Sequence, residues 1–318
     1  VLANEETYIP VLTGNLERFC ISCQHVAGAD RLDIRPLDGR PLEGGANVVY
    51  FCDVPAGPDI HFSTVTKDSG RLQYDSMEKM MELERAGIVD GYSMAPITKA
   101  GFHAAGLDFS SEFEVFAKFY GVPKCASVIK CENIFRSTVV GHCAFREIVE
   151  RLTPDGIVDT AHALLDTMAI FLGRENCRIA VAALNPHAGE DGLFGNEEAT
   201  IIQPAIDRLL AEGNQVIGPC PADTVFLKAR SGEVGGVVFL YHDQGNIAMK
   251  TRMFQTTACI YTNVPYPILS PGHGSALDIA ELGVANPTNI AYVLTTLTDI
   301  IRIRRQLSTD AEQITQAE

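Results

Sequence analysis

The stretch Gly236-Val-Val-Phe-Leu-Tyr-His-Asp-Gln-Gly245 joins an apolar, β-prone run to a polar turn. A short continuous apolar run of this kind is typical of a strand buried on both faces of a parallel sheet. Similar strand-like runs occupy residues 8–12, 47–51, 91–94, 127–130, 137–140, 178–183 and 257–262. Helical patterns occupy residues 74–85, 113–120, 157–172, 200–212 and 288 to about 305. This alternation predicts an α/β protein built on a parallel sheet with crossover helices.

The length of the chain indicates two domains. A sequence of 318 residues is long enough for two α/β domains. Neither a low-complexity linker nor an internal repeat separates two halves. We therefore expect one domain to be inserted into the other, so that the chain crosses between them more than once.

Charge and cysteine content limit the partners and the compartment. The net charge of −15 argues against nucleic acid and requires local cations for any anionic substrate. Nine scattered cysteines favour a reducing, cytoplasmic setting. Cys20-Ile-Ser-Cys23 lacks a second ligand pair, so we expect ordinary thiols on a helix. No apolar run approaches the ~20 residues of a membrane span.

Three histidines share one local context. His142, His187 and His242 each follow an apolar strand-like run and precede a polar turn. In open α/β sheets, ligands bind outside the carboxyl ends of the strands. A single loop histidine is usually surface, but three at such ends favour a shared site for a divalent transition metal.

Further polar residues lie beside this predicted site. Asp223 stands in the turn after Pro219-Cys-Pro-Ala, Asp243 adjoins His242, and Lys250 follows in the same segment. Lys99 follows Ala95-Pro-Ile-Thr at another strand end. We consider these four residues catalytic candidates, with solvated surface as the alternative for each. Asp243 in particular could orient the imidazole of His242.

A glycine-rich loop suggests a nucleotide site. Ser270-Pro-Gly-His-Gly-Ser-Ala-Leu-Asp-Ile-Ala280 is followed by Gly283-Val-Ala-Asn-Pro287. Glycines allow the backbone to approach a ligand closely, and Ser275 and Asp278 could cap a helix or bind hydroxyl groups. These features are those of an adenosine-binding loop.

The motifs together resemble a known family. Leu184-Asn-Pro-His-Ala-Gly-Glu190, Pro219-x-Pro-Ala-Asp-Thr224, Tyr241-His-Asp-Gln-Gly245, Ala95-Pro-Ile-Thr-Lys99 and Ala105-Gly-Leu-Asp-Phe109 resemble the signatures of 4-hydroxythreonine-4-phosphate dehydrogenase. The family includes terephthalate dihydrodiol dehydrogenase-like members. The loop from Ser270 is also similar to the adenosine loop of the related isopropylmalate and isocitrate dehydrogenases.

The resemblance implies a fold and an activity. The fold would be that of isocitrate and isopropylmalate dehydrogenases, with two α/β/α domains and a cleft. The cofactor-binding domain would comprise residues 1–105 and 255–318, and residues 106–254 would carry the metal ligands and the dimer interface. The enzyme would oxidise a hydroxyl group β to a carboxylate, with loss of carbon dioxide, as in pyridoxine biosynthesis.

The resemblance also assigns site residues. His142, His187 and His242 would hold the metal at a site shared between two subunits of a homodimer; imidazole ligands favour zinc, manganese or cobalt over magnesium. The NAD-binding residues would be His273, Gly274, Ser275, Ala276, Asp278 and Asn286. The acidic Asp278 would favour NAD over NADP. The family's N-terminal strand and glycine-rich loop would precede Val1.

The substrate positions depart from the family pattern. The aligned residues are Ser110 and Ser111, Cys259 and Ile268, and only Lys250 is retained. An aliphatic residue in place of an arginine should weaken phosphate binding. We therefore predict a phosphate-free hydroxy acid as the substrate. The alternatives are the family's own vitamin B6 reaction, a terephthalate-type cis-dihydrodiol carboxylate, an inactive metabolite-binding homologue, and an isopropylmalate-type dehydrogenase, against which the histidine motifs argue.

Overall fold

The computed structural model describes residues 8–317, and of residues 310–317 it describes the helical backbone alone. Contacts divide these residues into two units. The first comprises the described residues up to Cys125 together with Val264–Ile301, and the second comprises Ala126–Asn263 together with the end of the last helix from Arg302. The segment Ala126–Asn263 is therefore inserted between the two parts of the first unit.

The predicted domain boundaries, after residues 105 and 254, lie earlier in the chain than these contact boundaries. The difference at the first boundary comes from α4 (Glu112–Tyr120). Its Phe116 packs against Tyr92, with ring centroids 6.3 Å apart. The hydroxyl of Tyr120 donates a 3.1 Å hydrogen bond to the buried Glu84. These contacts join the helix to the first unit.

The first unit contains a parallel three-stranded sheet of order β1-β3-β2. Its strands are β1 (Val11–Gly14), β2 (Asp33–Pro36) and β3 (Val48–Asp53). The apolar residues Val48, Val49, Tyr50 and Phe51 of the central strand are buried. A further parallel pairing joins β4 (Tyr92–Ser93) and β11 (Ile268–Pro271).

The first unit contains several helices, and one of them, α2 (Lys67–Arg85), begins well before its predicted start. They are α1 (Leu16–Cys23), η1 (Ala29–Arg31), α2, α3 (Lys99–Ala104), α4, η6 (Leu277–Ile279) and the first part of α10 (Thr288–Ala317). Helix α2 begins earlier than residue 74 because Thr66 and Ser69 form a reciprocal capping box. Cys20 and Cys23 lie on α1, as predicted.

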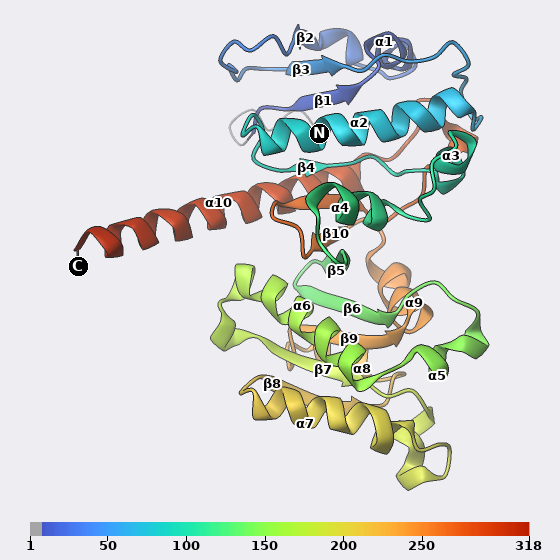
Figure 1. The fold of residues 1–318 in the computed structure, drawn as a ribbon, viewed down its shortest axis with the longest axis vertical. Helices are drawn as coiled ribbons and strands as arrows, with labels where there is room; N and C mark the ends of the chain where they lie inside the picture. The colour runs from blue at the N-terminus through green and yellow to red at the C-terminus, as the bar shows by residue number, and fades with distance from the viewer. Residues whose placement is uncertain (1–7, 318) are drawn as a thin grey trace. The chain divides into compact units, whose positions relative to one another are not determined.

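The second unit is built on strands in the order β10-β5-β6-β9-β7-β8. They are β5 (Ala126–Cys131), β6 (Ile134–Val140), β7 (Arg178–Ala182), β8 (Gln215–Cys220), β9 (Gly236–Tyr241) and β10 (Thr257–Thr262). Strands β6, β9, β7 and β8 run parallel to one another (Figure 1). Strand β5 is antiparallel to both of its neighbours. The carboxyl ends of β6, β9 and β7 therefore lie side by side.

Helices cover both faces of this sheet. They are η2 (Phe145–Glu147), α5 (Ile148–Arg151), α6 (Pro154–Leu172), η3 (Arg174–Asn176), η4 (Pro186–Gly192), η5 (Glu198–Ile202), α7 (Gln203–Ala211), α8 (Val225–Arg230) and α9 (His242–Met253). Val238 and Leu240 of β9 belong to the core cluster that contains α6, whereas Val237 and Phe239 belong to the cluster that contains α9. This alternation follows from the two-residue period of a strand. Burial of each such side chain stabilises the fold by about 1.5–3 kcal/mol.

The α/β class is confirmed, and β6, β9, β7 and β8 form the predicted parallel arrangement with crossover helices. The strand predicted at residues 127–130 departs from it, because β5 is antiparallel to both of its neighbours. The strands predicted at residues 236–241 and 257–262 match β9 and β10 at both ends. The last helix begins at the predicted Thr288 and continues beyond residue 305 to Ala317.

Candidate functional site

The three predicted metal ligands follow three neighbouring parallel strands. His142 comes shortly after β6, His242 directly after β9, and His187 after β7. Because these strands are adjacent and parallel, their ends lie at one edge of the sheet. The fold thus delivers all three imidazoles to the position at which α/β sheets bind ligands.

His142 and His242 lie next to each other. Their ring centroids are 4.8 Å apart, and the rings are tilted by 43°. Nδ1 of His242 lies 2.6 Å from Oδ1 of Asp243. A carboxylate in this position accepts the Nδ1 proton, which leaves Nε2 as the nitrogen with a lone pair for a metal ion. The two imidazoles fit as part of a nitrogen-rich site for zinc, manganese or cobalt.

His187 lies in a separate turn. Its side chain is 66% exposed, and Nδ1 lies 3.1 Å from Oε1 of Glu190. Residues 187–191 all have positive φ angles, which turn the chain sharply after β7. Among the described residues, no three histidine, cysteine or acidic side chains are close enough together to hold a metal ion. The structure of one chain therefore brings two of the three predicted ligands together.

A buried carboxylate anchors the start of this turn. Glu198 accepts hydrogen bonds from the backbone N–H groups of Leu184 and Asn185, at 2.9 and 2.7 Å. It also accepts one from Nδ2 of Asn185, at 2.9 Å. Burial raises the pKa of Glu198, but these hydrogen bonds outweigh burial and hold the pKa below its ordinary value. Glu198 thus fixes the start of the Asn185-Pro-His187 motif at the end of β7.

Gln244 and Gly245 of the Tyr241-His-Asp-Gln-Gly245 motif have structural roles at the end of β9. The side chain of Gln244 accepts a bond from the N–H of Leu240 and donates one to the carbonyl of Ala183, both at 2.9 Å, so it ties the ends of β9 and β7 together. A Cβ on Gly245 would lie 2.7 Å from the ring of Phe239. Glycine therefore allows α9 to pack closely against the sheet.

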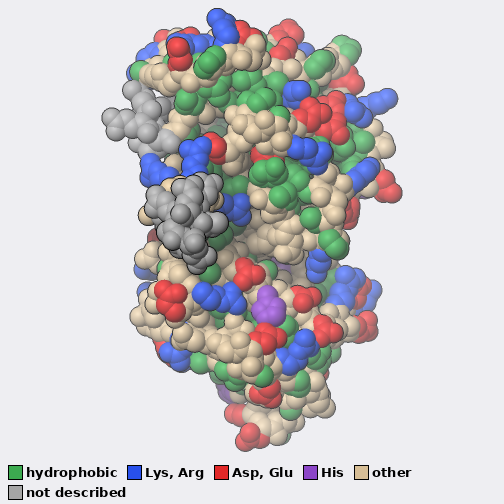
Figure 2. All heavy atoms as spheres, turned by 60° about the vertical axis from the view of Figure 1, so that its left-hand side comes forward, with side chains coloured by type: hydrophobic (Ala, Val, Ile, Leu, Met, Phe, Trp, Pro, Cys, Tyr) green, Lys and Arg blue, Asp and Glu red, His purple; other side chains and the backbone are tan. Residues whose placement is uncertain are grey.

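The other candidates of the second unit surround this edge. Asp223 is exposed in the turn between β8 and α8, and Lys250 is exposed on α9. His242, Asn246 and Lys250 are spaced four residues apart and so share one side of α9. We name these three residues the α9 stripe. Acidic and basic side chains are interspersed on the face shown in Figure 2, and histidine is visible among them.

The remaining catalytic and substrate candidates lie in the first unit, apart from Cys259 on β10 of the second. Lys99 is exposed at the start of α3. Ser110 donates its N–H and hydroxyl to the carboxylate of Glu114, and Ser111 precedes α4 without a side-chain cap. Ile268 is fully buried on β11. The carboxylate of Glu114 occupies the donors of Ser110, and residue 268 is aliphatic. These two positions therefore offer no cation to an anionic group.

The predicted cofactor loop follows β11. The segment Gly274–Ala276 and Asp278 are exposed, and no hydrogen bond involves the side chains of Ser275 or Asp278 among the described residues. The predicted helix-capping role of this pair is therefore not seen, and Ala276 occupies the N-cap of η6. His273 contacts the carbonyl of Gly274, and Asn286 accepts a bond from the N–H of Thr288 at the start of α10.

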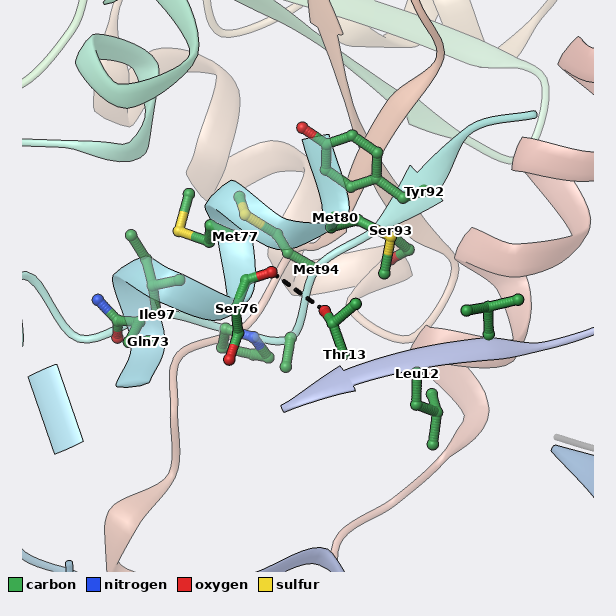
Figure 3. A pocket seen from close by; sticks show the side chains of 13 residues that line it. Leu12, Thr13, Gln73, Ser76, Met77, Met80, Tyr92, Ser93, Met94 and Ile97 are labelled. Atoms are coloured by element: carbon green, nitrogen blue, oxygen red, sulfur yellow. Dashed lines mark hydrogen bonds between the residues drawn. The ribbon is translucent and has the colours of Figure 1, made fainter. Parts of the chain in front are cut away.

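A cavity of about 280 Å³ lies elsewhere in the first unit. Strand β1, helix α2 and the segment from β4 to Ile97 line it (Figure 3). Apolar side chains such as Met77, Met80 and Met94 dominate its wall, and the hydroxyl of Thr13 bonds to the carbonyl of Ser76 at its rim. None of its lining residues is charged, and none is one of the predicted site residues.

Comparison with known proteins identifies the family. Residues 15–296 match the sequence model described as pyridoxal phosphate biosynthetic protein PdxA. The chain belongs to the PdxA family. The predicted resemblance is thereby confirmed, and the chain is an oxidoreductase of the dehydrogenase type.

Individual PdxA relatives are similar over most of the chain. A 4-hydroxythreonine-4-phosphate dehydrogenase from Beijerinckia indica is 38% identical over 248 residues, which are 78% of this chain and 73% of the relative. A D-threonate 4-phosphate dehydrogenase from Salmonella typhimurium is 36% identical over 246 residues, 77% of this chain and 75% of the relative. The crystal structure of a 4-hydroxythreonine-4-phosphate dehydrogenase from Klebsiella pneumoniae gives a TM-score of 0.79 at 26% identity and covers 94% of this chain and 99% of that one.

Sequence reasoning assigned no role to three polar residues of the second unit. Gln244 and Glu198 hold the strand ends, and Arg136 lies buried on β6. A charged side chain inside the run Ile134-Phe-Arg-Ser-Thr-Val-Val140 was the available signal for Arg136.

No helix among the described residues is long and apolar enough to cross a membrane.

Proposed function

We propose that this PdxA-family protein oxidises a phosphorylated four-carbon hydroxy acid of the D-threonate 4-phosphate or 4-hydroxythreonine 4-phosphate kind. It would use NAD and a divalent metal ion. The placement of the three histidines after neighbouring strands carries the proposal. The names of the relatives support a phosphorylated substrate better than the phosphate-free one predicted from the substitutions.

A homodimer would complete the metal site. His142 and His242 would bind from one subunit, and the partner subunit's His187 would be the third ligand. Exposed apolar side chains next to these histidines support an interface here: Phe145, Leu193, Phe194 and Ile247 are 79%, 71%, 47% and 68% exposed. When bound, the metal would polarise the hydroxyl and the later carbonyl oxygen of the substrate.

The chain's own residues would move the protons. NAD, when bound, would accept the hydride from the β-carbon, and the hydroxyl proton would pass to a nearby base. The bond to the carboxylate would then break with release of carbon dioxide, and its electron pair would stay on the α-carbon, which would take up a proton. Lys250 and Asp223, at the edge of the second unit, are the candidates for these transfers, and Lys99 is the candidate from the first unit. Asp243 would orient His242.

The loop after β11 would hold the adenosine of NAD. Its exposed backbone from Gly274 to Ala276 allows close approach of a ligand, and the carboxylate of Asp278 suits the ribose hydroxyls. The negative charge of Asp278 would repel the 2′-phosphate of NADP. This combination supports NAD as the cofactor.

A phosphate-free hydroxy acid, including a cis-dihydrodiol carboxylate, is the second candidate substrate. The buried Ile268 and the Ser110–Glu114 pair favour it, because neither provides a cation for a phosphate group.

Parallel assays separate the two candidates. The purified protein is given NAD, each divalent metal in turn, and either D-threonate 4-phosphate, 4-phosphohydroxythreonine or unphosphorylated D-threonate, and NADH absorbance is followed. Turnover confined to the phosphate esters supports the main proposal. Turnover of D-threonate at an equal rate supports the second candidate. If a cis-dihydrodiol carboxylate added to the same assay also yields no NADH with any metal, the inactive homologue is supported.

A further inference from the structure

Arg136 is a buried cation in the centre of the second unit. It lies on β6, and its exposed fraction is 7%. It points to the sheet face covered by α9, because its Cδ lies close to Gly245 of that helix. Burial lowers the pKa of Arg136 to about 10, still high enough to keep the guanidinium charged at neutral pH.

This cation has no counter-charge among the described residues. Its Nη1 donates to Oγ1 of Thr138 at 2.8 Å and its Nη2 to Oδ1 of Asn246 at 2.5 Å, and both acceptors are neutral. Its buried Nε has no hydrogen-bond partner. A buried charge without an ionic partner is strongly unfavourable. An arginine in this state is therefore suited to an anion supplied from outside the chain.

The position of Arg136 connects it to the predicted substrate residues. Asn246 is the middle residue of the α9 stripe, between His242 and Lys250. Arg136 also pairs across the sheet with Ile129, which in turn pairs with Cys259. Directly opposed residues share a sheet face. Arg136 thus lies under α9, the helix that carries Lys250. It also lies on the sheet face that carries Cys259, and both of these residues are predicted substrate positions.

We propose that Arg136, together with Lys250, binds the phosphate group of the substrate. The inference rests on the proposed function for the identity of the ligand. It explains how a chain with isoleucine at position 268 could still bind a phosphate ester, because Arg136 supplies a fork of N–H donors. Phosphate oxygens would bind the unpaired Nε and take the place of the neutral acceptors of the guanidinium.

Phosphate binding without turnover tests this inference. The unfolding temperature of the full chain is measured in phosphate-free buffer and with increasing inorganic phosphate, for the wild type, Arg136→Met, Arg136→Lys and the control Arg252→Met. Arg252 is exposed on the same helix. We expect phosphate to stabilise the wild type and the control, with its dissociation constant weakened on the order of 10–100-fold in Arg136→Met. We also expect Arg136→Met to unfold at no lower temperature than the wild type without phosphate, because methionine removes the unpaired charge.

Equal phosphate stabilisation in Arg136→Met and the wild type, or none in the wild type, overturns the inference. If Arg136→Met does not fold, Arg136→Lys decides: a dissociation constant about tenfold weaker supports the inference, and an unchanged one overturns it. Titration with D-threonate and with D-threonate 4-phosphate then separates a carboxylate from a phosphate ligand. Dependence on Arg136 for the ester alone supports the phosphate assignment, and equal dependence for both overturns it. Because these titrations need neither NAD nor metal, their outcome is independent of whether the enzyme turns over.

Discussion

The carboxyl ends of β9 and β11 carry two of the motifs of this molecule, and these two are organised in opposite ways. After β9, Asp243, Gln244 and Gly245 are all committed to contacts within the second unit. After β11, Gly274, Ser275 and Asp278 are exposed, and the side chains of Ser275 and Asp278 form no hydrogen bond among the described residues. The first end is preorganised by its own chain, whereas the exposed groups of the second are free to contact the proposed cofactor. Changes at β9 should therefore affect stability and chemistry together, and changes at β11 should affect cofactor binding alone.

The largest effect is expected from His242→Ala. Loss of a metal ligand should lower kcat/KM on the order of 10³-fold or more and reduce the metal content measured by mass spectrometry. His162→Ala is the matched control, because His162 is an exposed histidine of the same unit that pairs with Glu212. Full metal content in His242→Ala would show that the end of β9 is not the metal site.

Glu198→Gln tests the anchor of the third ligand. The amide oxygen of glutamine can keep the two backbone N–H bonds that Oε1 accepts, but its N–H₂ group would face Nδ2 of Asn185, which now donates to Oε2. Because two donors would then oppose each other, we expect a loss of about 1–3 kcal/mol in the free energy of unfolding. Urea denaturation measures it. A depressed pKa contributes stability above the unfolded pKa, and that contribution is lost as pH falls through the folded pKa. The difference between wild type and variant should therefore shrink as the medium is acidified below the ordinary glutamate pKa; an unchanged difference would contradict this account.

Gly245→Ala and Gly274→Ala compare the two ends directly. The methyl group at 245 would collide with Phe239, whereas nothing lies within 4 Å of a Cβ at 274. We expect Gly245→Ala to destabilise the protein by about 1–3 kcal/mol and Gly274→Ala to leave the unfolding free energy unchanged. Equal losses at both sites would remove the distinction between a packed and an exposed strand end.

The smallest effect is expected from Asp278→Asn. Loss of the carboxylate should raise KM for NAD about tenfold and reduce the preference for NAD over NADP, with the unfolding free energy unchanged. Steady-state kinetics with both nucleotides measure the change. An unaltered KM would assign the ribose contact to another part of the chain.

Much of this organisation could be predicted from the sequence, because the strong local patterns and the functional motifs coincide. The run from Gly236 to Tyr241 is apolar throughout, and its strand is confirmed at both ends. Strand β2, by contrast, has the sequence Asp-Ile-Arg-Pro, which contains residues that are rare in strands, and it was not predicted. Its pairing with β3 stabilises the strand despite this composition.

The parts of the site that could not be predicted depend on long-range contacts. Arg136 and Asn246 are 110 residues apart in the chain. Nothing local to either residue indicates that they meet, and only the register of β6 with β9 brings α9 over Arg136. The placement of His142, His187 and His242 at the ends of neighbouring strands could be predicted, because adjacency of parallel strands is a property of the whole fold class.

The central claim is that the strand ends of two subunits share one metal site, and subunit mixing tests it most directly. His187→Ala and His242→Ala are each inactive under this account. Unfolded, mixed in equal amounts and refolded, they should regain about a quarter of wild-type activity, since half of the dimers contain one intact site of two. Activity that stays at the level of the separate variants, with mixed dimers present, would contradict the shared site.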